Sequence, residues 1–201
     1  MQIQVFNIGM LFTNCYVANC PETKEAILID PGFDTPEEAE QILRYVGSHK
    51  LKVKLIVNTH GHSDHIQGDK IIKRKYRIPI CIHPYDALCL KGLGEDIPPA
   101  NVLLEDNTLV QFGKITLRVM HTPGHSLGSI SLVGEDLVFT GDTLFAGNIG
   151  RTDFQGGSDR DMKVSLEKLM RLPDDFVVYP GHGGFSTIGK EKRVNPFLLW
   201  L

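Results

Sequence analysis

The sequence predicts a single α/β domain. Short apolar runs rich in β-branched residues alternate along the chain with segments in which apolar residues recur at helical spacing. The length of 201 residues is enough for one domain with a substantial core and too small for two domains of ordinary size. Neither a low-complexity stretch nor a linker divides the sequence. We therefore expect one domain over residues 1–201.

The composition argues against several classes of protein. Hydrophobic residues make up 42% and charged residues 22% of the chain, as in globular proteins that fold in water. The net charge of −3 gives no electrostatic reason to expect nucleic acid or anionic lipid as a partner. No apolar run approaches the length of a membrane span, and no basic segment precedes an apolar one at the N-terminus. These features favour a cytoplasmic protein without a membrane partner.

The cysteines predict a structural role. They occur without a C-x-x-C pair, so we expect buried thiols rather than a disulfide framework or a zinc knuckle. Free cysteine is among the residue types that are most often buried. The four positions are Cys15, Cys20, Cys81 and Cys89.

The first part of the chain predicts a meander of strands followed by a helix. Three apolar, β-rich runs with turn residues between them predict antiparallel strands: residues 3–8, 14–18 and 26–29. Asp30 follows the third run, where its carboxylate either caps a turn or orients a metal-bound histidine, and the two roles are compatible. A helix is expected to begin at Thr35, with Pro36 in its first turn and Glu38 completing a capping box.

The stretch with the clearest chemistry lies on a loop between a strand and a helix. The loop reads T-H-G-H-S-D-H and runs from Thr59 to His65. An apolar run, residues 53–57, precedes it and predicts a buried strand, and the spacing in residues 66–76 predicts an exposed helix. Such a loop lets side chains converge while the elements on either side hold them in place.

The spacing within this loop predicts a metal site. His60 and His62 are two apart, so on extended backbone both can point the same way. Asp64 and His65 follow one short step later and can face a second point nearby. Imidazole and carboxylate ligands together suit zinc, iron or manganese.

The rest of the chain predicts further elements, with polar residues at the ends of three strands. The expected strands are residues 79–82, 109–112, 115–120, 129–133, 137–139 and 176–179, and the expected helices are residues 85–90 and 159–171. His125, Asp142 and His182 follow three of these strands. We expect His121, four residues before His125, to lie outside the metal site.

Two segments are expected to be less regular. Residues 92–107, which contain two adjacent prolines, form a loop that either covers the metal site or makes a surface excursion. At the C-terminus a polar segment leads into the apolar residues 196–201, where Phe197 and Trp200 would be unfavourable in water. We expect this tail to pack on the body of the protein or on a second subunit of a homo-oligomer.

The order of these polar residues along the chain, His-x-His-x-Asp-His, then His125, Asp142 and His182, resembles the metallo-β-lactamase superfamily. The resemblance covers nearly the whole chain and implies an αβ/βα four-layer sandwich with two metal ions at one edge of its paired sheets. It implies that one ion is bound by His60, His62 and His125, the other by Asp64, His65 and His182, and that Asp142 bridges them. Asp64 and Asp142 are predicted to be catalytic as well.

Within the superfamily, the segment Gly141-Asp142-Thr143-Leu144-Phe145 followed by Gly150-Arg151 is similar to the single-domain glyoxalase II-like, or hydroxyacylglutathione hydrolase-like, branch. In full-length glyoxalase II a basic residue matching Arg151 contacts glutathione, so Arg151 is predicted to bind substrate. Glutathione recognition is expected to be weak, because Gly183-Gly184-Phe185 replaces Glu-Tyr and no helical domain follows in residues 183–201. The most familiar β-lactamases have cysteine in place of Asp142, which argues against antibiotic degradation.

The resemblance implies a dinuclear hydrolase of thioesters, or of related activated esters and lactones, in which a hydroxide between the ions is the nucleophile. A metal ion lowers the pKa of bound water to about 7. The expected cofactors are two divalent ions, zinc first and iron or manganese as alternatives. The expected partner is a small-molecule thioester or ester substrate.

Other functions remain open. Residues 151–155 also resemble iron-dependent persulfide dioxygenases, which would use His60, His125 and Asp142 as a two-histidine-one-carboxylate set around one iron. A promiscuous lactonase or phosphodiesterase of the same fold is a further alternative. Nucleic-acid processing lacks support because the chain is acidic. An alternative hypothesis for Arg151 and Asp153 is that they form a structural ion pair at the rim of the site.

Overall fold

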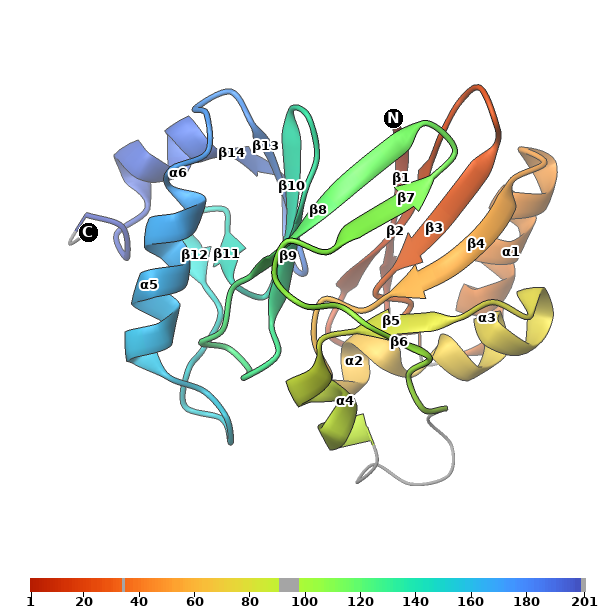
Figure 1. Ribbon diagram of the computed structural model, residues 1–201, viewed down its shortest axis with the longest axis horizontal. Coiled ribbons are helices and arrows are strands. Elements are labelled where there is room, and N and C mark those ends of the chain that lie inside the picture. The colour runs from red at the N-terminus through yellow and green to blue at the C-terminus, as the bar shows by residue number, and fades with distance from the viewer. Residues whose placement is uncertain (34, 91–97, 200–201) are drawn as a thin grey trace.

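The computed structural model describes residues 1–33, 35–90 and 98–199, with the backbone alone at residues 88–90. Two six-stranded sheets face each other in this part of the chain, and helices cover the outer face of each (Figure 1). In Figure 1 helices α5 and α6 lie on the left flank of the molecule and α1 lies on the right. These layers are the αβ/βα sandwich that the resemblance to the metallo-β-lactamase superfamily implied.

Most predicted elements are present. Sheet A consists, in spatial order, of β1 (Gln2–Ile8), β2 (Thr13–Asn19), β3 (Glu25–Ile29), β4 (Lys52–Val57), β5 (Ile80–Ile82) and β6 (Val102–Leu103). Sheet B consists of β14 (Ser186–Thr187), β13 (Val177–Pro180), β10 (Leu137–Gly141), β9 (Ile130–Val133), β8 (Ile115–His121) and β7 (Leu109–Phe112). A separate pair is formed by β11 (Leu144–Phe145) and β12 (Asn148–Ile149). The helices are α1 (Pro36–Ser48), α2 (Ser63–Ile66), α3 (Asp69–Tyr76), α4 (Pro84–Leu90), α5 (Asp159–Leu169) and α6 (Ile188–Val194).

The alternation of side chains along the strands divides the apolar residues among three cores. In β3, Leu28 belongs to the core between sheet A and helices α1 and α3, whereas Ile27 and Ile29 belong to the core between the two sheets. On the other side of sheet B, Val138 and Val178 pack with α5 and α6. Each sheet is therefore apolar on both faces, as a four-layer sandwich requires.

Strand directions bring the candidate residues to one edge. Strands β3, β4 and β5 are parallel, so their carboxyl ends share one edge of sheet A. In sheet B, β9 is antiparallel to both β8 and β10, and β13 is parallel to β10. The carboxyl ends of β8, β10 and β13 therefore share one edge of sheet B. Ligands commonly bind outside the carboxyl ends of strands in sheets of this kind.

Local signals at the start of the chain were accurate. The β1–β2–β3 meander is antiparallel, as predicted. Helix α1 has the predicted capping box, in which the Thr35 hydroxyl accepts a hydrogen bond from the Glu38 backbone and the Glu38 carboxylate accepts one from the Thr35 backbone. Cys15, Cys20 and Cys81 are buried free thiols, as expected. The side chain of Cys89 lies outside the described part.

The helix predicted over residues 66–76 is two helices, α2 and α3. The break falls at Gly68, whose backbone N–H donates to the Pro31 carbonyl at 2.8 Å. A Cβ atom added at Gly68 would lie 2.2 Å from that carbonyl oxygen and 2.4 Å from the Phe33 ring. The chain bends here because it packs against the turn after β3. The predicted exposure is also wrong in part, since Ile66 and Ile72 are fully buried.

The C-terminal segment differs from its prediction. The polar stretch after β13 contains β14 and α6, whose N-cap Thr187 accepts a hydrogen bond from the Lys190 backbone. Phe197 was expected to be buried, yet 47% of it is exposed, and Leu198 instead packs into the α5–α6 core. Asn195 accepts from the Phe197 backbone and fixes this turn. Trp200 lies outside the described residues.

The loop predicted over residues 92–107 is partly regular. Val102 and Leu103 form strand β6, which pairs in parallel with β5 at the edge of sheet A. This edge strand is short, and both of its residues are exposed. Residues 92–97, which the prediction placed either over the site or in a surface excursion, lie outside the described part.

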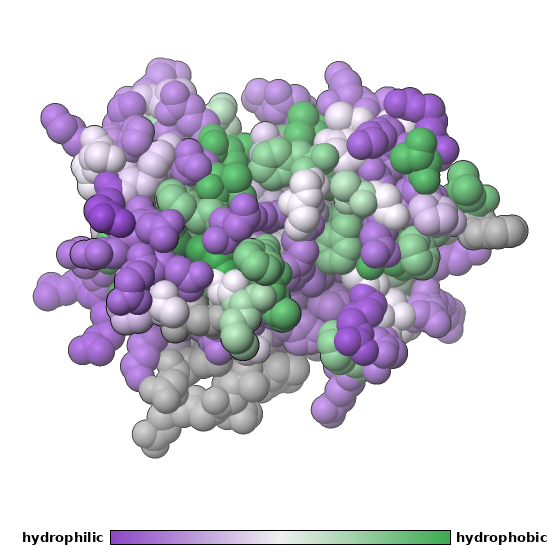
Figure 2. All heavy atoms as spheres, turned by 180° about the vertical axis from the view of Figure 1, so that it is seen from behind, coloured by the Kyte–Doolittle hydropathy of each residue, from purple (hydrophilic) through white to green (hydrophobic). Residues whose placement is uncertain are grey.

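None of the helices in the described ranges combines the length and the apolar composition that a bilayer crossing requires. Apolar side chains do reach the surface, and Figure 2 shows them gathered in the middle of one face, with hydrophilic side chains over much of its flanks. Three large exposed apolar residues, Met10, Leu11 and Phe12, form the turn between β1 and β2.

Candidate metal centre

All seven residues predicted to bind metal lie close together at the shared edge of the two sheets. The loop after β4 carries His60 and His62, and α2 carries Asp64 and His65. The other three follow strands of sheet B: His125 after β8, Asp142 after β10 and His182 after β13. The candidate ligand atoms form three overlapping groups, and within each group they lie within 4.8 Å of one another.

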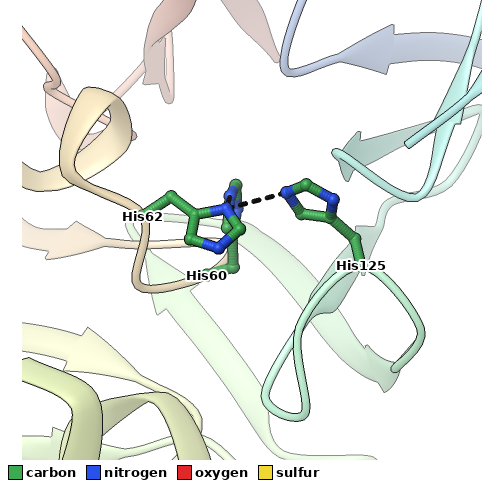
Figure 3. A group of neighbouring side chains, drawn as sticks. All are labelled: His60, His62 and His125. Carbon is green, nitrogen blue, oxygen red and sulfur yellow. Dashed lines mark hydrogen bonds between the residues drawn. The ribbon is translucent and has the colours of Figure 1, made fainter. Parts of the chain in front are cut away.

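His60, His62 and His125 form the first group, here called the first subsite. His62 Nδ1 lies 3.1 Å from His60 Nε2 and 2.8 Å from His125 Nε2. Figure 3 shows the rings of His62 and His125 pointing toward each other from loops on opposite sides. Burial lowers the pKa of His60 well below its ordinary value, and the neighbouring histidines lower it further. Burial, and then His125 and His65, also lower the pKa of His62. Neutral rings whose nitrogens converge in this way are suited to bind a cation.

Asp64, His65 and His182 form the second subsite. Asp64 Oδ2 lies 3.4 Å from His65 Nε2 and 3.3 Å from His182 Nε2. Burial would raise the pKa of Asp64, but hydrogen bonding to His182 and the proximity of His65 outweigh it and keep the pKa below its usual range. Burial would lower the pKa of His182, but hydrogen bonds to Asp142 and Asp64 raise it to about 10. A cation bound here would replace that proton.

Asp142 lies between the two subsites. Its Oδ2 is 3.5 Å from His125 Nε2 in the first subsite and 3.4 Å from His182 Nε2 in the second. Its Oδ1 is buried, and among the described residues it has no hydrogen-bond partner. A Cβ atom added at Gly181 would lie 2.1 Å from this oxygen, so only glycine admits the carboxylate here. A buried acceptor without a donor indicates a ligand position.

Three of the histidines are oriented by hydrogen bonds at Nδ1, the ring nitrogen that faces away from the site. The Nδ1 of His65 donates to Asp30 Oδ2 at 3.0 Å, and that of His125 donates to the Arg151 carbonyl at 2.8 Å. The Nδ1 of His182 donates to the Leu11 carbonyl at 3.1 Å. Each bond leaves Nε2 facing the site, which is the usual arrangement for metal-bound histidine. Together with the orphaned Asp142 oxygen, this donor set fits divalent metal ions.

Asp30 combines the two roles left open by the sequence. Its carboxylate accepts hydrogen bonds from the backbone and the hydroxyl of Thr59, each at 2.7 Å, and so shapes the turn before His60. It also accepts the bond from His65. Asp30 is almost fully buried, and its φ of 51° bends the chain beneath the site.

Three contacts at the site carry no signal in the sequence. The carbonyl groups of Leu11 and Arg151 hold histidines, and a backbone carbonyl is present at every position regardless of residue type. Thr13 donates from its hydroxyl to Asp64 Oδ2 at 3.0 Å, although it lies 51 residues away in sequence. Only the register of β2 against the loop after β4 could have indicated it.

The rim of the site carries an aromatic ring beside an exposed ion pair. The Phe154 ring lies 5.4 Å from the His62 ring and 6.0 Å from the His125 ring, centroid to centroid. The Arg151 guanidinium lies 4.0 Å above Phe154 and makes two hydrogen bonds of 2.7 Å to Asp153. Arg151 is thus the rim ion pair considered above, and a substrate carboxylate would compete with Asp153 for it.

His121 lies outside the metal site, as predicted. Its ring stacks on His83 at 4.1 Å, and its Nε2 donates to the Leu127 carbonyl at 2.9 Å.

Comparison with known families agrees with the fold. The family model for the metallo-β-lactamase superfamily matches residues 8–182, which include all seven clustered side chains. The chain belongs to the metallo-β-lactamase superfamily. Most members of this superfamily are hydrolases, and they bind divalent metals.

Several proteins are similar over nearly the whole length of this chain. An uncharacterized Mycobacterium leprae protein, ML0493, is 39% identical over 98% of this chain and 99% of its own. The hydroxyacylglutathione hydrolase GloC of Haemophilus influenzae is 34% identical over 96% of this chain and 98% of its own. Human mitochondrial persulfide dioxygenase ETHE1 is 35% identical over 92% of this chain and 71% of its own.

Solved structures of the superfamily superpose closely. The B3 metallo-β-lactamase BLEG-1 has a TM-score of 0.88 and is 34% identical in sequence. The match covers 98% of this chain and 99% of BLEG-1. ETHE1 from Myxococcus xanthus has a TM-score of 0.86 and is 32% identical. The match covers 98% of this chain and 84% of ETHE1. TTHA1623, solved in a di-iron-bound form, has a TM-score of 0.82 and is 34% identical. The match covers 97% of this chain and 100% of TTHA1623.

Proposed function

We propose that this chain is a dinuclear metal-dependent hydrolase of thioesters or of related activated esters, including lactones. The observation that carries the proposal is the position of Asp142, whose Oδ2 lies within 3.5 Å of a histidine of each subsite. A carboxylate has two oxygens and can bridge two ions. The similarity to a hydroxyacylglutathione hydrolase supports the choice of an acyl substrate.

In this proposal the first subsite would hold one divalent ion, the second subsite the other, and Asp142 would contact both. Zinc is the first expectation, and the di-iron form of TTHA1623 keeps iron a specific alternative. Two such ions would activate water at neutral pH and polarise the substrate carbonyl.

The chain's own groups would orient the reactants. The carboxylate of Asp64 lies in the second subsite and that of Asp142 lies between the two, and both can accept hydrogen bonds from a water molecule. Phe154 and the apolar turn at residues 10–12 offer apolar surface beside the two subsites. A thiolate leaving group departs with little acid assistance, which suits a rim whose described residues include no dedicated acid.

A second candidate is a mononuclear iron dioxygenase of persulfides. The similarity to ETHE1 proteins in both sequence and structure favours it. His60, His125 and Asp142 would supply the two-histidine-one-carboxylate set.

Metal analysis combined with activity separates the two. The protein is purified without added metal and assayed for metal content, thioester hydrolysis and oxygen consumption with glutathione persulfide. Two ions per chain with hydrolysis support the proposal. One iron per chain with oxygen consumption and no hydrolysis would replace it with the second candidate.

A further inference from the structure

Asp86 is a buried carboxylate next to the metal centre but outside the ligand set. It lies in the first turn of α4, and only 2% of it is exposed. Its Oδ2 accepts hydrogen bonds from the Gly61 backbone at 2.8 Å and from the Ser126 hydroxyl at 2.7 Å. Its Oδ1 accepts one from the Gly128 backbone at 2.7 Å. Both oxygens are therefore engaged by short, well-placed donors.

These donors belong to the two loops that build the first subsite. Gly61 lies between His60 and His62 on the loop after β4 of sheet A. Ser126 follows His125, and Gly128 lies on the same loop between β8 and β9 of sheet B. One carboxylate thus joins loops from opposite sheets beside all three histidines.

We propose that Asp86 is a positioning residue that fixes the distance between these loops and so sets the metal affinity of the first subsite. The inference rests on the metal centre proposed above. Hydrogen bonds to an ionised acceptor are stronger than neutral ones and hold their donors more firmly. In a buried network the loss of one acceptor leaves several donors without partners.

The packing around Asp86 supports a specific fit. A Cβ atom added at Gly128 would lie 2.4 Å from Asp86 Oδ1, and one added at Gly61 would lie 3.3 Å from the Asp86 Cβ. The Ser126 hydroxyl also lies 2.7 Å from the Ser129 hydroxyl, which joins the base of the His125 loop to the same network. Both loops therefore pack closely around Asp86, with little room for a different side chain.

The second subsite has different supports. Asp30 and Thr13 contact His65 and Asp64, and no contact of Asp86 reaches these residues within the described chain. Asp86→Asn keeps the shape of the side chain but replaces one acceptor oxygen with an NH₂ group that faces donors. Its effect should fall on the first subsite alone. A general structural role would instead weaken both subsites through loss of stability.

Zinc titration of metal-free protein in two backgrounds tests this. His182→Ala leaves only the first subsite complete, and His62→Ala leaves only the second. Asp86→Asn should weaken zinc binding by about 10–100-fold in the His182→Ala background, as loss of an outer partner does. It should leave affinity unchanged in the His62→Ala background. The matched control is Asp69→Asn, a buried carboxylate bonded to the Asn58 side chain, which should change neither affinity.

Equal weakening in both backgrounds, or no weakening in the His182→Ala background, would overturn the role of Asp86. An equal loss with Asp69→Asn would overturn it as well. If wild-type protein itself fails to bind two zinc ions, the proposed metal centre fails instead, and the two failures are thereby distinguished. If Asp86→Asn does not fold, Ser126→Ala decides, because it removes one donor and keeps the carboxylate. It should weaken the first subsite severalfold, and an unchanged affinity would overturn the proposal.

Discussion

The first subsite depends on loops contributed by both sheets, whereas the second is supported mainly from sheet A. Asp86 joins the loops that carry the histidines of the first subsite. In the second, Asp30 at the end of β3 holds His65, and Thr13 at the start of β2 holds Asp64. Each subsite has its own buried carboxylate outside the ligand set. We therefore expect that most substitutions in these supports change metal affinity mainly in one position, whereas Asp142 affects both.

The largest effect is expected from Asp142→Ala, which should remove this separation. Because Asp142 contacts histidines of both subsites, its loss should reduce bound metal at both and bring hydrolysis to background. His60→Ala should also abolish hydrolysis. Metal content and thioester hydrolysis are measured on protein shown to be folded by circular dichroism. The control is His49→Ala, an exposed residue bonded to the Tyr45 carbonyl, which should change little. Unchanged metal content in both ligand variants contradicts the ligand assignment.

Asp30→Asn should affect mainly the second subsite. The amide has one acceptor oxygen, so it can no longer accept from both the Thr59 backbone and His65, which use different oxygens of the carboxylate. Zinc affinity in the His62→Ala background should therefore fall by about 10–100-fold. A smaller loss is expected at the first subsite, because Thr59 precedes His60. Wild-type affinity at the second subsite in this variant would show that Asp30 only shapes the turn.

Acid should destabilise the protein through His83, which precedes the helix of Asp86. Burial, and then the stacked His121, lowers the pKa of His83 from 6.5 to about 4. Between these values the unfolded chain binds the proton and the folded chain does not, so stability falls as the pH drops from about 6.5 to about 4. The midpoint of urea unfolding for metal-free protein should decline less in His83→Gln over this range. Equal decline in both proteins would show that other groups cause the acid sensitivity.

The smallest effect is expected from Arg151→Ala. The side chain is exposed and already paired with Asp153, whereas the part that supports the first subsite is its backbone carbonyl, which alanine retains. Zinc affinity should be unchanged, and the ratio of kcat/KM for lactoyl-glutathione to that for a simple thioester should change by less than about fivefold. We also expect no strong preference for lactoyl-glutathione, because Gly183-Gly184-Phe185 follows His182. A preference of several orders of magnitude that Arg151→Ala abolishes would contradict this expectation.

The sequence predicted the strands, the first helix and the metal-binding loop because these leave local signals, whereas the four-layer arrangement and the full ligand set were implied by the resemblance to the superfamily. Alternating residues such as Ile27 and Leu28 belong to different cores, and the spacing of His60 and His62 is itself a metal-binding pattern. The capping box of α1 needs only residues 35–38. Each of these signals lies within a few residues along the chain.

The remaining features depend on contacts between distant segments. The break at Gly68 arises from packing against Pro31, and Asp86 acquires its role only because α4 lies beside two loops from different sheets. The predicted burial of Phe197 was wrong because the sequence of the tail does not show which of its six apolar residues face the body of the protein. In the structure Leu198 is buried while Phe197 is half exposed.

The existence of two independently supported metal positions is tested most directly by counting bound ions. Wild-type protein, His62→Ala and His182→Ala are loaded with zinc, freed of excess metal and analysed for metal per chain. We predict two ions in the wild-type protein and one in each variant, with the remaining ion lost on Asp142→Ala. A single ion in the wild-type protein that survives His182→Ala unchanged would contradict a dinuclear centre.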